Sequence, residues 1–208
     1  RIYDFKMRPE QLEAIKKTSN YFKISRRENN KKTPHFLWNA KMRFGKTFAA
    51  YQLAKKEKWK RVLILTFKPA VQNAWEDDLL LHKDFEGWQF VKNKGLKYSQ
   101  IDKKRPVVCF GSFQDFLGKT PSGGIKIKNK WAHQINWDSI ILDEYHYGSW
   151  RDTAKELYEG ESKYELKHSL GEGQEIWDES ISPLKTSNYL YLSGTPFKAI
   201  ESGEFIEE

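Results

Sequence analysis

Short continuous apolar runs recur along the chain, and segments with helical spacing separate most of them. The clearest run is Arg-Val-Leu-Ile-Leu-Thr at residues 61–66, which predicts a strand buried on both faces of a sheet. Other runs predict further strands at residues 35–39, 88–91, 106–110, 139–142 and 188–192. Helical spacing predicts helices at residues 9–22, 47–56, 69–80, 112–117 and 150–158.

The order of these elements predicts an α/β fold. Strands that alternate with helices pair in a parallel sheet through right-handed crossovers, which places helices on the faces of the sheet. Two polar and basic segments, residues 23–34 and 118–130, are expected to be loops. The 208 residues suffice for one such domain with a full core, and the sequence contains no internal repeat.

The first segment with candidate chemistry joins the strand at residues 35–39 to the helix after it. It reads Ala-Lys-Met-Arg-Phe-Gly-Lys-Thr at residues 40–47, and such a strand–loop–helix context predicts a phosphate-binding loop. Lys46 would contact the β- and γ-phosphates, and the Thr47 hydroxyl would ligate Mg²⁺. Ala40 replaces the first glycine of the usual pattern, which the loop tolerates if this residue does not need a positive φ.

Two adjacent carboxylates follow a second buried strand. Asp143 and Glu144 come directly after the apolar run 139–142, so they lie at the end of a strand where open α/β sheets bind ligands. On an extended strand end, adjacent side chains point in different directions, which allows the two acids separate roles. Asp143 is expected to hold Mg²⁺, and Glu144 to orient and deprotonate the water that attacks the γ-phosphate.

The composition favours polyanionic partners and excludes several other kinds of site. Lysine and arginine exceed the acids by 36 to 28, and the net charge of +8 attracts nucleic acid or nucleotides. The single cysteine, Cys109, lies in an apolar run and is expected to be a core residue. The histidines lack zinc-ligand spacing, and no apolar run is long enough to span a membrane. A cytoplasmic protein without a membrane partner is expected.

Together with two further segments, these residues resemble the first RecA-like domain of superfamily 2 helicases and translocases. Asp-Glu-Tyr-His at residues 143–146 looks like the D-E-x-H motif of the family, and Ser-Gly-Thr-Pro-Phe at residues 193–197 looks like its motif III. The phosphate loop is similar to motif I of helicases from restriction–modification systems. Arg-Pro-Glu-Gln at residues 8–11 is similar to the R-x-x-Q element, whose glutamine reads the adenine edge in the family.

The resemblance implies a RecA-like P-loop domain, with a central mostly parallel sheet flanked by helices on both faces, that binds ATP with Mg²⁺. The residues implied to bind the nucleotide are Gln11, Arg43, Phe44, Gly45, Lys46 and Thr47. Thr47 and Asp143 are implied to hold the metal ion, and Lys46 and Glu144 to act in catalysis. The residues implied to couple hydrolysis to movement are His146, Ser193 and Thr195.

Two strand ends correspond to places where the family contacts the nucleic-acid backbone. The first, which looks like motif Ia, offers Thr66 and Lys68, and the second offers Ser112 and Gln114. Both combine polar side chains and backbone N–H groups with a helix N-terminus, which suits phosphates. Ordinary capping of the helices that follow explains the same residues equally well.

The chain, residues 1–208, is expected to be the ATP-binding domain of a longer protein, since it begins with Arg1 rather than Met. The family has a second RecA-like domain, which supplies an arginine finger, and residues after Phe197 leave no room for it. The 208 residues alone are therefore expected to bind ATP weakly and to hydrolyse it poorly.

The resemblance favours a DNA helicase or translocase from a restriction–modification enzyme. Such a motor acts on double-stranded DNA, and its partners would be the second RecA-like domain and an attached nuclease or methyltransferase. An RNA helicase has the same motif order and remains an alternative. A small-molecule phosphotransferase with a phosphate loop, and a nucleic-acid-binding module without catalysis, are further alternatives.

Overall fold

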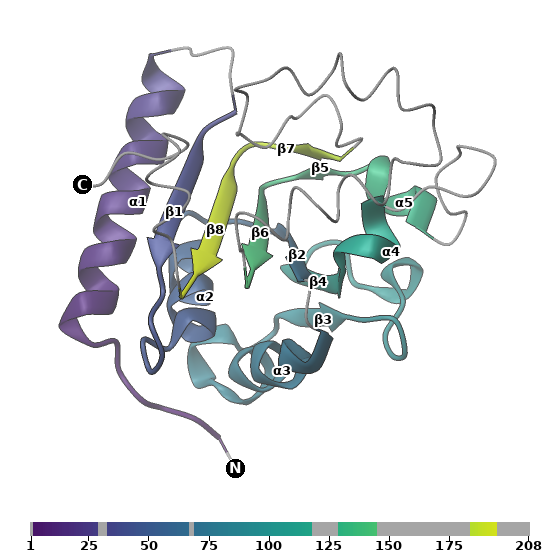
Figure 1. Cartoon of the computed structure of the whole chain (residues 1–208). Helices are drawn as coiled ribbons and strands as arrows, with labels where there is room; N and C mark the ends of the chain where they lie inside the picture. The colour runs from purple at the N-terminus through teal and green to yellow at the C-terminus, as the bar shows by residue number, and fades with distance from the viewer. Residues whose placement is uncertain (1, 29–32, 67–68, 118–128, 145–183, 195–208) are drawn as a thin grey trace.

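A six-stranded parallel sheet forms the centre of the computed structural model, which describes residues 2–28, 33–66, 69–117, 129–144 and 184–194. The strands are His35–Asn39 (β1), Arg61–Thr66 (β2), Gln89–Val91 (β3), Val107–Ser112 (β4), Ser139–Asp143 (β6) and Tyr189–Ser193 (β8). They lie in the order β1-β8-β6-β2-β4-β3, and each neighbouring pair is parallel (Figure 1). The predicted parallel sheet is thus confirmed.

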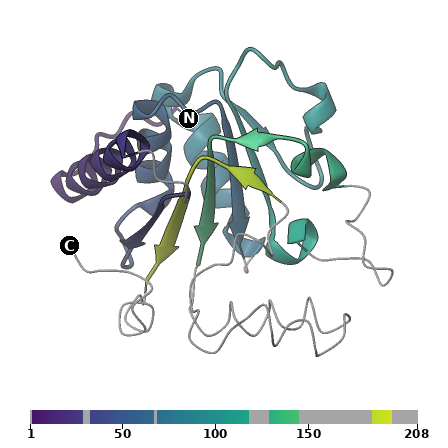
Figure 2. The ribbon, with the colours of Figure 1, turned by 90° about the horizontal axis from the view of Figure 1, so that it is seen from above.

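Helices cover the sheet from two sides. They are Pro9–Arg27 (α1), Lys46–Lys56 (α2), Gln72–Leu81 (α3), Phe113–Leu117 (α4) and Lys130–His133 (α5), with 3-10 turns at Pro69–Val71, Lys83–Phe85 and Tyr98–Gln100. One core joins the sheet to α1, α2 and α3, and a second core joins it to α4 and α5 (Figure 2). The predicted α/β class, with helices on both faces, is confirmed.

The two cores follow from the two-residue period of a strand. On β2, Val62 and Ile64 pack with residues of α1, α2 and α3, whereas Leu63 and Leu65 pack with residues of α4 and α5. All four are at most 1% exposed, and full burial of each side chain contributes about 1.5–3 kcal/mol to stability. A strand between two helical layers therefore has to be apolar at successive positions, and the strand predicted at residues 61–66 is confirmed at both ends.

The structure differs from the prediction mainly in the length of one helix and in several short elements. Helix α1 continues beyond Phe22 to Arg27, because basic residues stabilise the C-terminus of a helix and Arg26 pairs with Glu57 (3.0 Å). Helix α5 and the parallel pair of Asn136–Trp137 (β5) and Lys185–Thr186 (β7) were not predicted, since they are too short for periodicity to reveal. Residues 118–128 and 150–158 lie outside the described residues.

The segment before α1 is fixed to the end of α3. The N–H of Tyr3 donates to the carbonyl of Leu81 (2.7 Å), and the N–H of Lys83 donates to the carbonyl of Tyr3 (3.0 Å). This attachment holds Arg8, directly before α1, on the side of the sheet where the loop of residues 40–45 lies.

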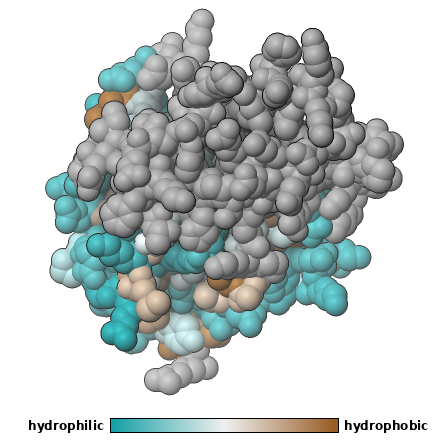
Figure 3. All heavy atoms as spheres, in the orientation of Figure 1, coloured by the Kyte–Doolittle hydropathy of each residue, from teal (hydrophilic) through white to brown (hydrophobic). Residues whose placement is uncertain are grey.

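The described surface is mainly polar where it can be seen. Figure 3 shows teal residues below the grey atoms, with a few separate brown and tan groups. Met42, in the loop after β1, has the most exposed large apolar side chain among the described residues, at 93%. No helix in the described part of the chain is long and apolar enough to cross a membrane.

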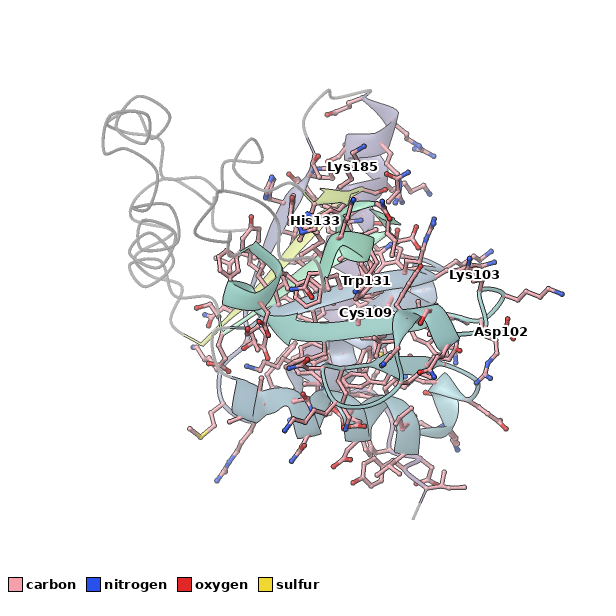
Figure 4. The ribbon with its side chains drawn as sticks, turned by 90° about the vertical axis from the view of Figure 1, so that its right-hand side faces the viewer. Asp102, Lys103, Cys109, Trp131, His133 and Lys185 are labelled. Carbon is pink, nitrogen blue, oxygen red and sulfur yellow. The ribbon has the colours of Figure 1, made fainter. Side chains whose placement is uncertain are left out.

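Cys109 lies in the middle of β4, inside the molecule, whereas Lys103 extends away from it (Figure 4). The thiol is fully buried, and this burial raises its pKa. The prediction that Cys109 is a core residue is confirmed.

Candidate nucleotide-binding site

Several of the predicted site residues meet at the carboxyl edge of the sheet. Thr66 lies opposite Asp143 on one side and opposite Ser112 on the other, and Asn39 lies opposite Ser193. In Figure 1 the arrowheads of β1, β8 and β6 point to this edge. Open parallel sheets bind their ligands at this edge, so the register alone brings the separate motifs to one place.

The loop between β1 and α2 has the backbone of an anion-binding site. Arg43 and Gly45 have φ values of 69° and 74°, and residues in this left-handed region turn successive N–H groups toward one side. Gly45 caps α2, so the positive N-terminal end of the helix dipole faces the loop, and no acidic residue in the first turn of α2 offsets it. Ala40 is not among the described residues with a positive φ, which meets the condition for replacing the usual glycine.

The start of α1 holds this loop in place. The side-chain amide of Gln11 donates to the carbonyls of Phe44 (2.8 Å) and Gly45 (3.3 Å), and its oxygen accepts from the N–H of Arg8 (2.9 Å). The Arg8 guanidinium also donates to the carbonyls of Arg43 and Phe44. Gln11 is only 3% exposed, so the structure shows it as a support of the loop, and its contact with an adenine base stays a prediction.

Lys46 connects the loop to the two adjacent carboxylates. Its ammonium nitrogen lies 2.7 Å from Oδ1 of Asp143 and also contacts Oε1 of Glu144, 98 positions away in sequence. Burial alone would lower the pKa of Lys46, but the charges and hydrogen bonds of the two carboxylates outweigh it, so the pKa lies above its usual value. This cation is therefore charged at neutral pH and is held where a phosphate group would compete for it.

The backbone at Glu144 explains why both acids reach the same lysine. The sequence predicted an extended strand end, on which the side chains of Asp143 and Glu144 would diverge. Instead Glu144 has a φ of 55°, so the chain turns directly after β6 and both carboxylates contact Lys46. A non-glycine residue in this left-handed region is strained, and such strain is concentrated at functional sites.

Helix α3 adds two side chains to the site. The indole N–H of the fully buried Trp75 donates to Oδ2 of Asp143 (2.7 Å), and the hydroxyl of Thr47 donates to Oδ2 of Asp78. Burial raises the pKa of the Asp78 carboxyl, and the hydrogen bond from Thr47 opposes this effect.

The residues present fit a magnesium ion bound together with a nucleotide. Thr47 and Asp143 supply the hydroxyl and carboxylate oxygens that Mg²⁺ prefers. In the described part of the chain, no group of three or more histidine, cysteine or acidic residues forms a complete metal cage. Mg²⁺ in nucleotide sites is usually bound by one or two protein groups together with the substrate phosphates.

The remaining predicted residues have mixed outcomes. The carbonyl of Ser193 accepts from the N–H of Ala40 (2.7 Å), which joins the end of β8 to the loop after β1. Ser112 accepts from the N–H of Asp115 (3.2 Å) and thereby caps α4, and Thr66 is only 1% exposed. Nucleic-acid contacts of Thr66 and Ser112 stay predictions. Three predicted residues, His146, Thr195 and Lys68, lie outside the described residues, as does the side chain of Gln114.

Arg8, Trp75 and Asp78 contribute to the site but were not predicted as part of it. Arg8 lies in the R-x-x-Q segment, from which the sequence assigned a role only to the glutamine. Trp75 and Asp78 are three positions apart on a predicted helix, so a shared face was foreseeable. The acceptor of a buried indole N–H, in contrast, cannot be read from the spacing of residues.

Comparison with protein families places the chain among restriction proteins. The family model described as "Type III restriction enzyme, res subunit" matches residues 4–198. A curated relative from Mycoplasma pneumoniae, named "Putative type II restriction enzyme and methyltransferase RM.MpnORF110P C-terminus", is 31% identical over 221 aligned positions. The match covers 95% of this chain and 29% of the relative, so the chain spans less than a third of that protein.

Two solved structures share the fold of this chain. The SWI2/SNF2 ATPase core of Sulfolobus solfataricus in complex with double-stranded DNA has a TM-score of 0.55 and 16% identity, covering 95% of this chain and 34% of that one. A nuclease-deletion mutant of the type ISP restriction-modification enzyme LlaGI, in complex with a DNA substrate mimic, has a TM-score of 0.52 and 14% identity, covering 92% and 18%. At these identities the likeness concerns the fold, which is RecA-like.

Proposed function

Because the chain belongs to the family of type III restriction enzyme res subunits, which is helicase-like and of superfamily 2, we propose that it binds and hydrolyses ATP to drive movement on DNA. The motor would be part of a longer restriction–modification enzyme, with residues 1–208 as its first RecA-like domain. The family membership supports an ATPase of helicase type.

One observation carries the proposal. The lysine of a phosphate-loop segment lies against two adjacent carboxylates at the carboxyl edge of a parallel sheet. A nucleotide phosphate placed in the loop would attract Lys46 away from the carboxylates, which would then face the metal ion and the attacking water.

Each group then has a defined task. Lys46 would bind the β- and γ-phosphates, and the N–H groups around Gly45 would hold the remaining phosphate oxygens. Glu144 would orient the water and accept its proton. Bound Mg²⁺ would neutralise developing charge on the phosphates, and Thr47 and Asp143 would hold it. Gln11 would read the adenine base from its place beside the loop.

The proposed partners are double-stranded DNA and a second RecA-like domain. The net charge of +8 supports a polyanionic partner, and one structural neighbour was solved with double-stranded DNA. A nuclease or methyltransferase would belong to the same enzyme, since the curated relative combines both kinds of name in a longer chain.

The experiment is a measurement of ATP hydrolysis by the full-length protein with duplex DNA, single-stranded DNA and RNA of matched length. We expect duplex DNA to stimulate hydrolysis most, and Glu144→Gln to lower the stimulated rate by about 10²–10⁴-fold, the usual contribution of a general base. Stronger stimulation by RNA would replace the proposal with an RNA helicase. Hydrolysis that no polynucleotide stimulates would exclude a nucleic-acid motor.

A further inference from the structure

One face of α3 contacts both residues that are predicted to face the metal ion. Trp75 and Asp78 are three positions apart, so their side chains leave the helix on the same side. Trp75 donates to Asp143 (2.7 Å), and Asp78 accepts from Thr47. Neither residue lies in the segments 40–47 or 143–146.

The two carboxylate oxygens of Asp143 accept hydrogen bonds from different groups. Oδ1 accepts from the ammonium of Lys46 (2.7 Å) and from the N–H of Glu144 (2.8 Å). Oδ2 accepts from Nε1 of Trp75 in the buried interior. Since rotation of the carboxylate would break the indole bond, Trp75 keeps Oδ1 turned toward the loop when a nucleotide takes Lys46 away.

The contact of Thr47 fixes the direction of its hydroxyl in the same way. The hydroxyl has one hydrogen and two lone pairs. Because the hydrogen is directed at Asp78, the lone pairs point elsewhere and remain available to a cation. Without this acceptor the hydroxyl could rotate and direct its hydrogen toward the position of the metal ion.

Helix α2 holds this part of α3 in place. The Tyr51 hydroxyl donates to the carbonyl of Trp75 (2.8 Å), and the two rings meet edge to face with their centroids 5.3 Å apart. Both side chains are fully buried. The contact therefore ties the position of Trp75 to α2, whose N-terminus carries Lys46 and Thr47.

We propose that Trp75 and Asp78 are positioning residues that orient Asp143 and Thr47 toward nucleotide-bound Mg²⁺. The inference rests on the proposed function, because it requires that this edge of the sheet binds ATP with Mg²⁺. It adds that these two side chains of α3 determine how much Mg²⁺ increases the affinity for the nucleotide.

The test compares nucleotide binding with and without the metal ion in the full-length protein. A non-hydrolysable ATP analogue is titrated calorimetrically in excess EDTA and again in Mg²⁺, and the ratio of the two dissociation constants gives the magnesium gain. We expect Trp75→Phe and Asp78→Ala to lower this gain about 10- to 100-fold, as for other residues that support metal ligands. Their affinities in EDTA stay close to that of the wild type, because neither side chain faces the phosphates.

Matched variants separate positioning from a general loss of structure. Trp137 is also fully buried and donates through its indole N–H, but to the carbonyl of Ala132 in the other core. Asp77 is an exposed acid next to Asp78. We expect Trp137→Phe and Asp77→Ala to keep the magnesium gain of the wild type. Asp78→Asn is also expected to keep it, unlike Asp78→Ala, because the amide oxygen still accepts the hydrogen bond from Thr47. If Trp75→Phe does not fold, the Asp78 series carries the test.

The outcomes distinguish this inference from the proposed function. A wild-type protein that binds the analogue with a magnesium gain, together with Trp75→Phe and Asp78→Ala variants that keep the gain, overturns the inference alone. An equal loss in the Trp137 or Asp77 control also overturns it. A wild-type protein without any magnesium gain overturns both the inference and the proposed ATP–Mg²⁺ site.

Discussion

The ammonium nitrogen of Lys46 lies 2.7 Å from Oδ1 of Asp143, and this contact joins the loop after β1 to the end of β6. Asp143 is only 1% exposed, so its negative charge needs a partner inside the protein. In the proposed cycle Lys46 is that partner until a nucleotide arrives, and the metal ion then compensates the charge. The contact therefore links the stability of the protein to the proposed chemistry of the site.

The first prediction concerns Gly45, which has a left-handed backbone and directly precedes α2. Gly45→Ala introduces a methyl group at a φ of 74°, and this methyl would lie 2.7 Å from Nε2 of Gln11. The backbone strain costs about 1–2 kcal/mol, and the collision displaces the amide that supports the loop. We expect lower thermal stability together with a loss of ATP binding, measured by thermal unfolding and by calorimetry.

Gly87→Ala is the control for the first prediction. Gly87 has a similar φ of 85°, but its new methyl group would have only Arg105 within contact distance, at 3.9 Å. The variant is expected to lose similar stability through strain and to keep its affinity for ATP. Equal affinities in the two variants would show that the loop does not hold the nucleotide.

A second prediction concerns Ala40, which replaces the first glycine of the usual phosphate loop. Its φ is not positive and its side chain is 6% exposed, so a glycine there offers no conformational advantage. Ala40→Gly is expected to lower stability by about 0.5–1 kcal/mol, because glycine loses more conformational freedom on folding. Nucleotide affinity should stay unchanged, and an increase would mean that the loop changes shape at residue 40 on binding.

A third prediction follows from the raised pKa of Lys46. The folded pKa lies above the unfolded value of 10.5, so the stabilisation is fully present below pH 10.5 and is lost as the pH rises through the folded pKa. We expect Lys46→Ala to be less stable than the wild type by about 1–3 kcal/mol at pH 8, since it leaves the buried carboxylate of Asp143 without a cation.

The measurement for this third prediction is the free energy of unfolding as a function of pH in both proteins. The difference between wild type and Lys46→Ala should shrink above pH 10.5, while other lysines and tyrosines affect both proteins alike. A difference that stays constant across this range would mean that Lys46 is not paired with Asp143 and Glu144 in the folded protein.

The sequence predicted best the features that depend on local pattern. Residues 61–66 were predicted to the residue because a strand between two helical layers is apolar at successive positions. The motifs also predicted that residues 40–47 and Asp143 serve one site, since each follows a strand of the same parallel sheet. Register then brings such strand ends together without further information.

The features that sequence missed depend on contacts between side chains. Helical spacing predicted the helix that carries Trp75, yet it could not show that the indole N–H meets Asp143 rather than a backbone carbonyl. The left-handed backbone at Glu144 was missed because few non-glycine residues adopt it, and no sequence signal marks this one. The loop expected after Phe22 was helical because charge, rather than apolar spacing, stabilises the last turn of α1.

The central claim is that the loop of residues 40–47 binds the phosphates of ATP through Lys46. Its most direct test is calorimetric titration of the full-length wild type, Lys46→Ala and Lys41→Ala with a non-hydrolysable ATP analogue in Mg²⁺. Lys41 lies in the same loop with an exposed side chain, so its replacement removes the same charge. Saturable binding by the wild type and Lys41→Ala, with about 10- to 100-fold weaker binding by Lys46→Ala, is the predicted result. Equal affinities for all three proteins, or no binding by the wild type, would contradict the account.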